Sequence, residues 1–326
     1  MKNRVEFITL VGIPGSGKST YSSKYSALGY EIYSSDVVRD QILKKIQTGE
    51  VKLPHNTNLN AFLFDYIKEQ TIKSLNNGIS VVFDATNLGR KRRMNFLKGL
   101  YKVDCVKKCL LFITPVDECL RRNNLRLGYA RLPFEAMYKM FCNFECPYYW
   151  EGWDEIIPIT CEMPYKFDFN LIKGFSQDNP HHTLTLDGHI NMAHELAVEN
   201  NFTSEVQLAL KYHDIGKYYT KRFENFKGEK TEYAHFYGHE GYSAYLFLTE
   251  FCSGKQLSSE EFNQILYLTN LINCHMRPLT VWKNSDKAKE KDKKLFGDTF
   301  FTDLVNLNKC DGLAHWGENE LKFTYM

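Results

Sequence analysis

The segment Gly12–Ser19 constrains the fold of this chain more than any other part of it. It reads Gly-Ile-Pro-Gly-Ser-Gly-Lys-Ser and satisfies the P-loop pattern GxxxxGK[ST]. An apolar run, Phe7–Val11, precedes it, and a helical pattern, Ser19–Leu28, follows it. In that context backbone N–H groups and a helix N-terminus converge on phosphate oxygens. The sequence therefore predicts a strand, a phosphate-binding loop and a helix.

This loop is expected to bind ATP, or another nucleoside triphosphate, together with Mg²⁺. Lys18 would contact the β- and γ-phosphates, and Ser19 would ligate Mg²⁺. The predicted nucleotide-binding residues belong to the loop and the start of its helix: Gly12, Gly15, Ser16, Gly17, Lys18, Ser19 and Thr20.

The first half of the chain alternates strand-like and helix-like segments. Apolar runs rich in β-formers occur at Tyr30–Tyr33, Ile79–Phe83 and Val106–Ile113, and helical spacing occurs at Val37–Ile46 and Ala61–Leu75. This alternation favours an α/β domain with a parallel sheet flanked by helices. We place this P-loop kinase domain at residues 1–155.

The pattern changes after about Trp153. Prolines interrupt the next stretch, and few strand signals remain beyond it. We therefore predict an all-α domain at residues 165–326, and we expect the Lys-rich run Lys283–Lys294 to be a solvated loop. The expected helices are Gly188–Asn200, Glu205–His213, Gly238–Phe251, Ser259–Ile272 and Thr299–His315.

Composition limits the possible partners. The net charge of +2 over 326 residues gives no argument for nucleic-acid binding. No apolar run is long enough to span a bilayer and no signal-peptide pattern is present, so we expect a cytoplasmic protein without a membrane partner. The nine cysteines are expected to be reduced thiols in the core. Nothing in the sequence indicates an oligomeric state.

Charged residues in the first half suggest how a phosphate acceptor would be held. Asp36 follows the second apolar run, where a carboxylate can take a proton from an attacking hydroxyl. Arg39 lies on the same helical face and suits an anionic group on the acceptor. A helix-capping Asp with a surface Arg is the alternative. Asp84, at the end of another strand, could support the metal or orient Arg39.

Two groups of arginines follow, at Arg90–Arg93 and Arg121–Arg126. Arg122 and Arg126 are spaced i, i+4 and share a helix face. Paired arginines suit a lid that neutralises the charge on a transferring phosphoryl group. For any one of them, a solvated basic face is the alternative.

These motifs together resemble the kinase domain of phage and bacterial polynucleotide 5′-hydroxyl kinases, over roughly residues 1–150. The resemblance implies that Asp36 is the general base, that Arg39 clamps the 3′-phosphate of the acceptor, and that Arg122 and Arg126 are lid residues. The sequence Asp84-Ala85-Thr86-Asn87 stands where the family often has a contiguous Asp-Thr-Asn, which leaves the role of Asp84 open.

Histidines and aspartates form a second pattern in the other half. Imidazole and carboxylate are ligands of divalent transition metals such as Mn, Ni, Co, Fe or Zn. One metal could bind four of these residues, and Asp214 could bridge to a second metal on His239 and His275. Two metals about 3.5–4 Å apart can generate hydroxide and clamp a phosphate ester. The candidate ligands are His189, His213, Asp214, His239, His275 and Asp311.

The strings Tyr212–Lys217, Phe236–Glu240 and Cys310–Ala314 resemble the HD phosphohydrolase superfamily, over roughly residues 165–326. They are most similar to HD domains found with polynucleotide kinases and tRNA nucleotidyltransferases, which often carry a run like Asn179–Leu186. The resemblance implies metal-dependent phosphomonoesterase or phosphodiesterase activity, with Lys217 binding the scissile phosphate.

The remaining histidines are weaker candidates. His181 and His182 could line the pocket of the second half, and His235 could contact substrate there. The other three are expected to be structural: His55, His194 and His315.

One centre that adds phosphate and another that removes it make sense together on a broken nucleic-acid strand. Ligation needs a 5′-phosphate and a 3′-hydroxyl, whereas many nucleases leave a 5′-hydroxyl and a 2′,3′-cyclic phosphate or 3′-phosphate. We therefore favour an end-healing enzyme for RNA, in preference to DNA, with sealing left to a separate ligase. Two alternatives stay open: a nucleoside or nucleotide kinase fused to an HD nucleotidase, and a nucleotide-sensing regulatory protein.

Overall fold

The computed structural model describes residues 4–55, 57–180 and 182–315. The chain divides into two compact units. The first extends to Arg131 and includes Pro147–Thr160, and the second consists of Leu132–Cys146 and the chain from Cys161 onward. Among the described residues, no helix has both the length and the apolar character that crossing a membrane requires.

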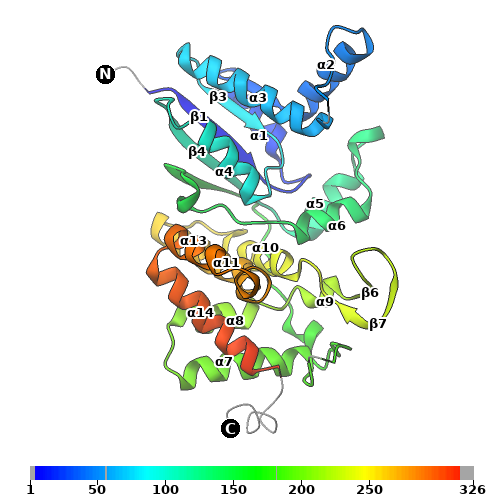
Figure 1. Cartoon of the computed structure of the whole chain (residues 1–326), viewed down its shortest axis with the longest axis vertical. Coiled ribbons are helices and arrows are strands. Elements are labelled where there is room, and N and C mark those ends of the chain that lie inside the picture. The colour runs from blue at the N-terminus through cyan, green and yellow to red at the C-terminus, as the bar shows by residue number, and fades with distance from the viewer. Residues whose placement is uncertain (1–3, 56, 181, 316–326) are drawn as a thin grey trace. The chain divides into compact units, whose positions relative to one another are not determined.

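A five-stranded sheet with all neighbouring strands parallel forms the centre of the first unit (Figure 1). Its strand order is β2-β3-β1-β4-β5, and the four strands expected from the sequence are all present. The fifth contains Pro158, which an edge strand tolerates because one side of it needs no ladder hydrogen bonds. The strands are β1 Glu6–Val11, β2 Glu31–Ser34, β3 Val81–Asp84, β4 Val106–Ile113 and β5 Glu155–Thr160.

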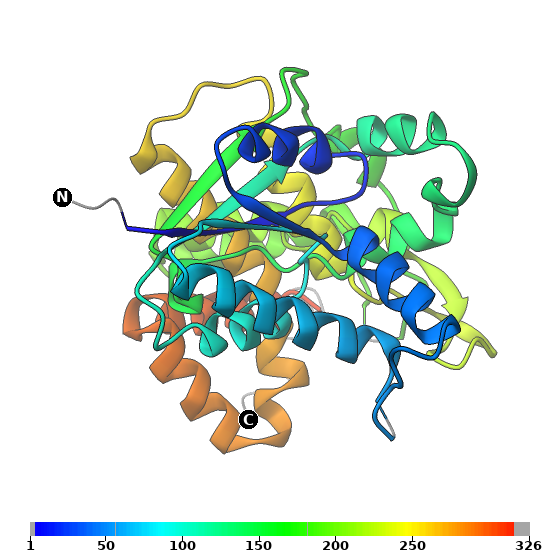
Figure 2. The same ribbon diagram turned by 90° about the horizontal axis from the view of Figure 1, so that it is seen from above.

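Helices cover both faces of this sheet (Figure 2). Ile8 and Leu10 of β1 face the helix that follows the P-loop and pack with its Tyr21. The ring of Phe7 points to the other face and stacks on Phe96 at 5.1 Å. Burial on both faces explains the continuous apolar strands. The helices are α1 Lys18–Ser26, α2 Ser35–Gln47, α3 Leu59–Asn76, α4 Arg90–Gly99 and α5 Val116–Asn124, with short 3₁₀ turns at Gly128–Ala130 and Tyr149–Glu151.

The sheet topology brings the candidate residues of the first unit to one edge. Strand β1 ends at the P-loop, β2 leads directly to Asp36, and β3 ends at Asp84. Ser34 and Asp84 are paired in register. Because the carboxyl ends of parallel strands meet at the same edge, three separate stretches of sequence converge there.

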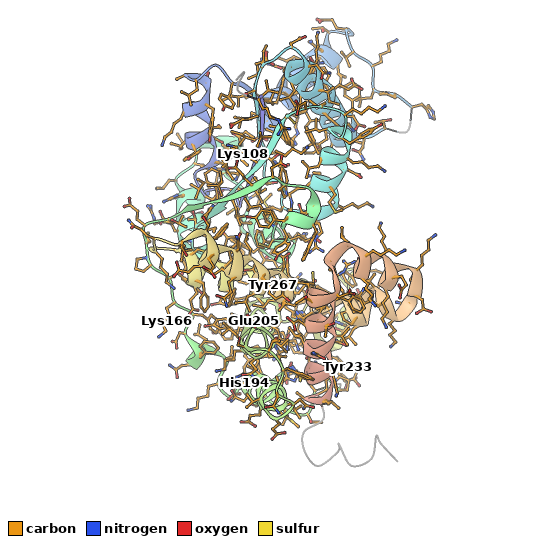
Figure 3. All side chains as sticks on the ribbon, turned by 90° about the vertical axis from the view of Figure 1, so that its left-hand side faces the viewer. Lys108, Lys166, His194, Glu205, Tyr233 and Tyr267 are labelled. Carbon is orange, nitrogen blue, oxygen red and sulfur yellow. The ribbon has the colours of Figure 1, made fainter. Side chains whose placement is uncertain are left out.

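In its described residues the second unit consists of helices, irregular segments and a two-stranded antiparallel hairpin, β6–β7, so the expectation of an all-α domain was wrong at the hairpin. Tyr267 of α11, labelled in Figure 3, donates a hydrogen bond to Asp303 of α14 at 2.6 Å, which joins those two helices. The elements are α6 Phe134–Cys142, α7 Leu186–Glu199, α8 Ser204–Tyr212, α9 Lys217–Thr220, β6 Arg222–Glu224, β7 Lys230–His235, α10 His239–Cys252, α11 Ser259–Cys274, α12 Arg277–Thr280, α13 Asp286–Phe296 and α14 Asp298–Leu313, with 3₁₀ turns at Phe169–Ile172 and Trp282–Asn284.

The Lys-rich run expected to be a loop forms helix α13 instead. Ser285 caps its N-terminus by accepting a hydrogen bond from the N–H of Ala288. Asp292 points inward and accepts hydrogen bonds from Arg277 and Trp282. Buried hydrogen bonds to Asp292 therefore hold this helix in place, and the high overall charge of the run did not indicate them.

Helix α6 groups with the second unit, although the expected boundary of 1–155 placed it in the first domain. Phe141 packs edge-on against Tyr245 of α10, with the ring centroids 5.0 Å apart. Gly241 allows this approach, since a Cβ there would lie 2.2 Å from the carbonyl oxygen of Cys142. Contacts with α10, which lies far along the chain, decide which core this helix joins.

A buried ion pair holds helix α4 and the loop after β3 to the last 3₁₀ turn of the first unit. The guanidinium of Arg93 makes two hydrogen bonds to the carboxylate of Glu151, at 2.7 and 2.6 Å, and both side chains are fully buried. Arg93 also donates to the carbonyl oxygens of Asn87 and Leu88, and Trp153 donates to Glu151. This arginine of the 90–93 group is therefore structural.

Arg93→Ala should lower the free energy of unfolding by about 3–5 kcal/mol, because it leaves the Glu151 carboxylate buried without its partner. Urea unfolding followed by tryptophan fluorescence measures the change. The control is Arg4→Ala, which removes an exposed pair with Asp104 and should cost no more than about 1 kcal/mol. Equal losses in the two variants would contradict the structural role of Arg93.

Candidate functional site

The P-loop of the first unit has the backbone that phosphate binding requires. Gly15 and Gly17 have φ values of +87° and +100°, which disfavour any residue with a Cβ. A Cβ on Gly15 would also lie 2.6 Å from the carbonyl oxygen of Cys119. The hydroxyl of Ser16 is buried and has no hydrogen-bond partner among the described residues. An anion in the loop would give it one.

Lys18 lies at the start of α1 with its ammonium folded against the loop. Its Nζ donates to the carbonyl oxygens of Gly12 and Ile13 at 2.8 and 3.0 Å. Burial lowers the pKa of Lys18 to about 8, and the nearby Asp84 opposes that shift. A partly desolvated ammonium favours an added negative charge such as a triphosphate.

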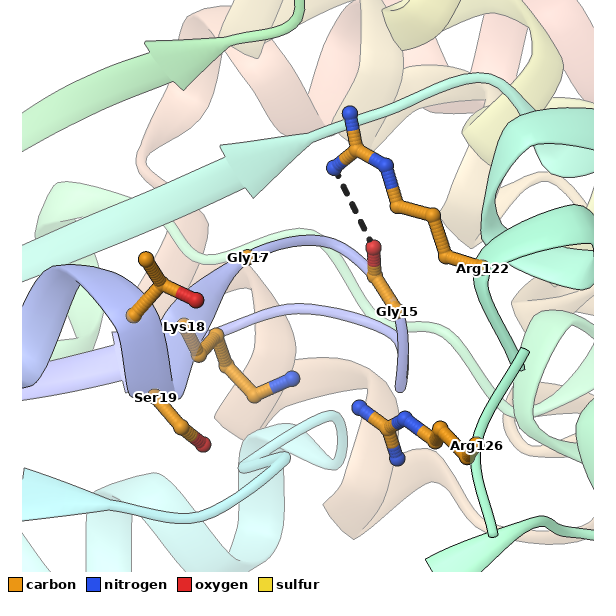
Figure 4. Close-up of a pocket in the computed structure, with 7 residues that line it drawn as sticks. Gly15, Gly17, Lys18, Ser19, Arg122 and Arg126 are labelled. Atoms are coloured by element: carbon orange, nitrogen blue, oxygen red, sulfur yellow. Dashed lines mark hydrogen bonds between the residues drawn. The ribbon is translucent and has the colours of Figure 1, made fainter.

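A pocket of about 320 Å³ opens beside the loop (Figure 4). Two arginines from separate positions on the chain reach it: Arg122 donates to the carbonyl oxygen of Gly15 at 3.3 Å, and Arg126 lies across the pocket from Lys18. The structure brings both arginines to this pocket, but they do not share a helix face as expected, because α5 ends at Asn124 and Arg126 lies beyond it. The lining residues are Gly15, Gly17, Lys18, Ser19, Thr20, Arg122 and Arg126.

Glu118 restrains the arginines of α5. It accepts hydrogen bonds from Arg121 and from Arg122, and these two guanidinium groups lower its pKa to about 2. The Nε of Arg122 is therefore held by Glu118 while its Nη1 points to the P-loop. Holding one end of the side chain in this way orients the other end toward the phosphate loop.

Asp84 and Ser19 supply oxygen ligands of the kind that Mg²⁺ prefers. Burial raises the pKa of Asp84, while Lys18 and hydrogen bonds from Ser22 and Ser19 oppose that shift. Ser22 donates to Asp84 at 3.1 Å. The carboxylate and the Ser19 hydroxyl thus meet beside Lys18 and fit a Mg²⁺ site.

Asp36 and Arg39 lie together on the first turns of α2. Arg39 donates to Asp36 at 3.0 Å and to Asn60 at 3.4 Å. The Asp36 side chain is 87% exposed, and that of Arg39 is 35% exposed. Asp36 and Asn60 are thus the residues that orient Arg39.

A cluster of imidazoles and carboxylates lies buried in the second unit. The Nε2 atoms of His189 and His213 lie 3.1–3.3 Å from Oδ1 of Asp311 and from Oδ2 of Asp214. The Nε2 atoms of His239 and His275 lie 3.2 and 3.6 Å from the other oxygen, Oδ1, of Asp214. All six candidate ligands therefore meet, with Asp214 shared between two groups.

The four histidines are oriented in the same way. Each Nδ1 lies within hydrogen-bonding distance of a backbone carbonyl oxygen: Ala314 for His189, Leu210 for His213, Phe236 for His239 and Ile272 for His275. A proton on Nδ1 leaves a lone pair on Nε2, which is the tautomer that metal ligands adopt. All four lone pairs then point toward Asp214 and Asp311.

This donor set fits one or two divalent transition metals. Nε2 of His189 and Oδ2 of Asp214 are both buried and lie 3.2 Å apart. Nε2 of His239 and of His275 lie only 3.0 Å apart. Burial lowers the pKa of His213, but the adjacent Asp214 and then Asp311 raise it to about 10. Carboxylates that attract a proton so strongly attract a divalent cation for the same reason.

Lys217 lies next to the shared carboxylate. Its Nζ is 2.7 Å from Oδ2 of Asp214 and 3.0 Å from Oε1 of Gln177. His182 lies 3.4 Å away on its other side, and burial, followed by the charge of Lys217, lowers the pKa of His182 to about 2. His182 is therefore a neutral acceptor beside Lys217 and belongs to this site.

His315 was expected to be structural, but its Nε2 lies 3.5 Å from Oδ1 of Asp311. It also forms a group with His182 and His189. The signal in the sequence was its position four residues after Asp311, which puts both on one side of the chain as α14 ends.

The other histidines lie outside the metal-like groups that the described residues form. His194 is half-buried on α7 (Figure 3), His55 is exposed near the start of α3, and His235 stacks on Tyr237. His181 lies outside the described residues.

Comparisons with known proteins cover mainly the first half of the chain. Residues 7–147 match a family model described as an AAA domain, which agrees with the kinase-like P-loop fold of the first unit. No curated protein matches the sequence.

The solved structures that match this chain have low sequence identities and low TM-scores. A sugar kinase from Janibacter sp. HTCC2649 has a TM-score of 0.36 and 16% identity, over 48% of this chain and 84% of its own. A gluconokinase from Sinorhizobium meliloti 1021 has a TM-score of 0.34 and 19% identity, over 48% and 82%. A chain of the Pnkp1/Rnl/Hen1 RNA repair complex has a TM-score of 0.36 and 22% identity, over 44% and 45%. At these values none of the three carries an argument about substrate.

The second unit should bind two Mn²⁺ ions per chain after chelation and reloading. Asp214→Ala should lose both because its two oxygens face the two ligand groups, and His275→Ala should lose one. Metal content after gel filtration, measured by mass spectrometry, checks this. His194→Ala is the control and should keep both ions; two ions in Asp214→Ala would contradict the bridging role.

Proposed function

We propose that the chain heals broken nucleic-acid ends, with RNA as the favoured substrate. The first unit transfers the γ-phosphate of ATP to a 5′-hydroxyl, and the second removes a 2′,3′-cyclic phosphate, 2′-phosphate or 3′-phosphate. The observation that carries the proposal is the convergence of four histidine Nε2 atoms on two buried aspartates, in a chain that also has a P-loop. A separate ligase would seal the healed ends.

In the first unit, positive charge surrounds the position of the transferring phosphate. Lys18, Arg122 and Arg126 meet at the pocket beside the P-loop, where they would neutralise the developing charge. Mg²⁺ on Ser19 and Asp84 would add charge neutralisation at the β- and γ-phosphates. Asp36 accepts the proton of the attacking hydroxyl, and Arg39 holds a phosphate of the acceptor.

The exposure of Asp36 supports a large acceptor. A carboxylate that is 87% exposed lies at an open approach, whereas a nucleoside kinase would be expected to enclose its acceptor in a pocket. An open approach lets a polymer end reach the carboxylate while the rest of the strand stays outside. This favours a polynucleotide over a free nucleoside.

In the second unit, bound divalent cations would supply hydroxide at neutral pH and stabilise charge on the phosphate ester. The protein residues have separate roles. Asp214 offers one oxygen to each ligand group, and the carbonyl-bound histidines keep their lone pairs inward. Lys217, 2.7 Å from Asp214, places a fixed positive charge where it would contact the scissile phosphate.

Two variants should separate the two activities. Lys18→Ala should abolish phosphorylation of a 5′-hydroxyl while sparing removal of a 3′-phosphate, and Asp214→Ala should do the reverse, because the residues belong to different sites. The assay incubates an oligonucleotide carrying both ends with ATP and Mg²⁺ or Mn²⁺ and maps both termini. Loss of both activities in both variants would refute the two-site model, and no change at either end in the wild type would favour a small-molecule substrate.

The acceptor pair can be tested with small substrates. Asp36→Asn should lower kcat by about 10²–10⁴-fold, the range of general-base catalysis. Arg39→Ala should raise KM for a nucleoside 3′-phosphate by about 10- to 100-fold but leave KM for the nucleoside unchanged. Lys45→Ala, an exposed cation on the same helix, is the matched control. An equal effect of Arg39→Ala on both substrates would contradict phosphate recognition.

A further inference from the structure

The β6–β7 hairpin connects two residues of the second site. It begins after the helix that Lys217 starts and ends just before His239. In Figure 1 it projects from the helices of its unit. Three rings at the turn, at the end of β7 and just after β7 contact one another. His235 stacks on Tyr237, with centroids 5.1 Å apart and planes within 9°, and Phe226 lies against Tyr237 with centroids 3.7 Å apart and planes tilted by 34°. We call His235, Tyr237 and Phe226 the ring stack.

We propose that the ring stack is a platform for an unpaired nucleobase of the strand whose terminal phosphate enters the metal-ligand cluster. This inference rests on the proposed phosphatase function and extends it, because it assigns a single-stranded end as the substrate. It also assigns a role to the ring stack, which has none in the proposed removal of phosphate.

The outer end of the ring stack is open. Phe226 is 85% exposed although Tyr237 covers one side of its ring, so the opposite face is in solvent. Leaving an aromatic ring in water forfeits the free energy of burying it. A nucleobase is a flat ring that can continue such a stack, and base–aromatic stacking is the main device of proteins that bind unpaired strands.

The chain segment that carries two rings of the stack also contacts the metal-ligand cluster through Phe236. Phe236 lies between His235 and Tyr237 in sequence. Its carbonyl oxygen lies 2.7 Å from Nδ1 of the ligand His239, and its ring lies 5.5 Å from Nζ of Lys217. The segment that carries His235 and Tyr237 therefore also contacts a candidate metal ligand and Lys217.

Backbone hydrogen bonds attach the hairpin to the rest of the site. Ala234 donates its N–H to the carbonyl oxygen of Asp178, and the Asn179 side chain donates to the carbonyl oxygen of Ala234, both at 2.9 Å. The segment carrying Asp178 and Asn179 leads to His182, which contacts Lys217. The platform is thus fixed relative to the phosphate site rather than carried on an independent loop.

The charge of the hairpin favours stacking over phosphate pairing. Its basic side chains are nearly balanced by acidic ones, and Lys221 is already paired with Asp178. A duplex-binding surface needs a clear excess of cations along the backbone of the nucleic acid. A nearly neutral surface with an exposed ring instead suits stacking on a base, and an unpaired strand leaves its bases accessible for that contact. In order along the chain the charged residues are Lys221, Arg222, Glu224, Lys227, Glu229, Lys230 and Glu232.

Phe226→Ala tests the platform with two substrates of the full-length protein loaded with Mn²⁺. One is a single-stranded oligonucleotide with a 5′-phosphate and a 3′-phosphate, so that the kinase site has no acceptor hydroxyl. The other is p-nitrophenyl phosphate, which has no base. The variant should raise KM for the oligonucleotide by about 5- to 100-fold, the range of base stacking, and leave kcat/KM for p-nitrophenyl phosphate within about twofold.

Further variants separate stacking from general damage. Phe226→Trp should restore oligonucleotide binding, whereas Phe226→Leu, which keeps an apolar side chain without a ring, should not. Tyr233→Ala removes an exposed ring of the same hairpin outside the ring stack and is the matched control. For an oligonucleotide with abasic terminal nucleotides, the wild type should show the raised KM, and Phe226→Ala should raise that KM no further.

Each contrary result has a distinct meaning. Unchanged KM in Phe226→Ala, or an equal loss on both substrates, overturns the platform while leaving the phosphatase in place. If the wild type hydrolyses neither substrate, the proposed function fails, and fluorescence anisotropy of the same oligonucleotide then decides the platform by whether Phe226→Ala weakens binding. Unchanged binding together with an altered oligomeric state would assign Phe226 to a contact between copies of this chain and overturn the proposal.

Discussion

The buried carboxylate of Asp214 is the interaction on which the second unit depends. A buried charge is tolerated only when other groups compensate it. Four imidazoles and the Lys217 ammonium approach its two oxygens, and they come from α7, the end of α8, the start of α9, the start of α10 and the end of α11. The arrangement of these helices is therefore fixed by a polar centre as well as by apolar packing. A cation bound there would link metal affinity to folding stability.

The first unit depends on a local constraint instead. Gly15 and Gly17 adopt backbone angles that other residues avoid, and the parallel sheet places Asp36 and Asp84 beside the resulting loop. Because the loop geometry resides in consecutive residues, the sequence predicted it directly. The strands around it were predicted for a similar reason, since strands buried on both faces are apolar throughout.

What the sequence could not predict required knowledge of partners far along the chain. Arg93 and Arg122 look alike in sequence, yet one is buried against Glu151 and the other reaches the P-loop. Helix α6 has ordinary apolar spacing, which says nothing about which core it joins. The Lys-rich run became a helix through the inward-pointing Asp292, and His315 joined the site because α14 ends beside it. The six candidate ligands were recognised as a pattern, but only folding shows that they meet.

In the proposed function, one site must exclude water from its reaction and the other must use water as the nucleophile. Phosphoryl transfer to a hydroxyl requires that water not compete for the γ-phosphate, so fixed cations and backbone N–H groups suit that task. Phosphate removal requires water as the nucleophile, so a ligand set able to hold metal ions suits it. One pocket could not meet both requirements. Placing Lys18 in one unit and Asp214 in the other lets each environment suit its own proposed reaction, and a strand with two damaged ends is the proposed substrate that would use both.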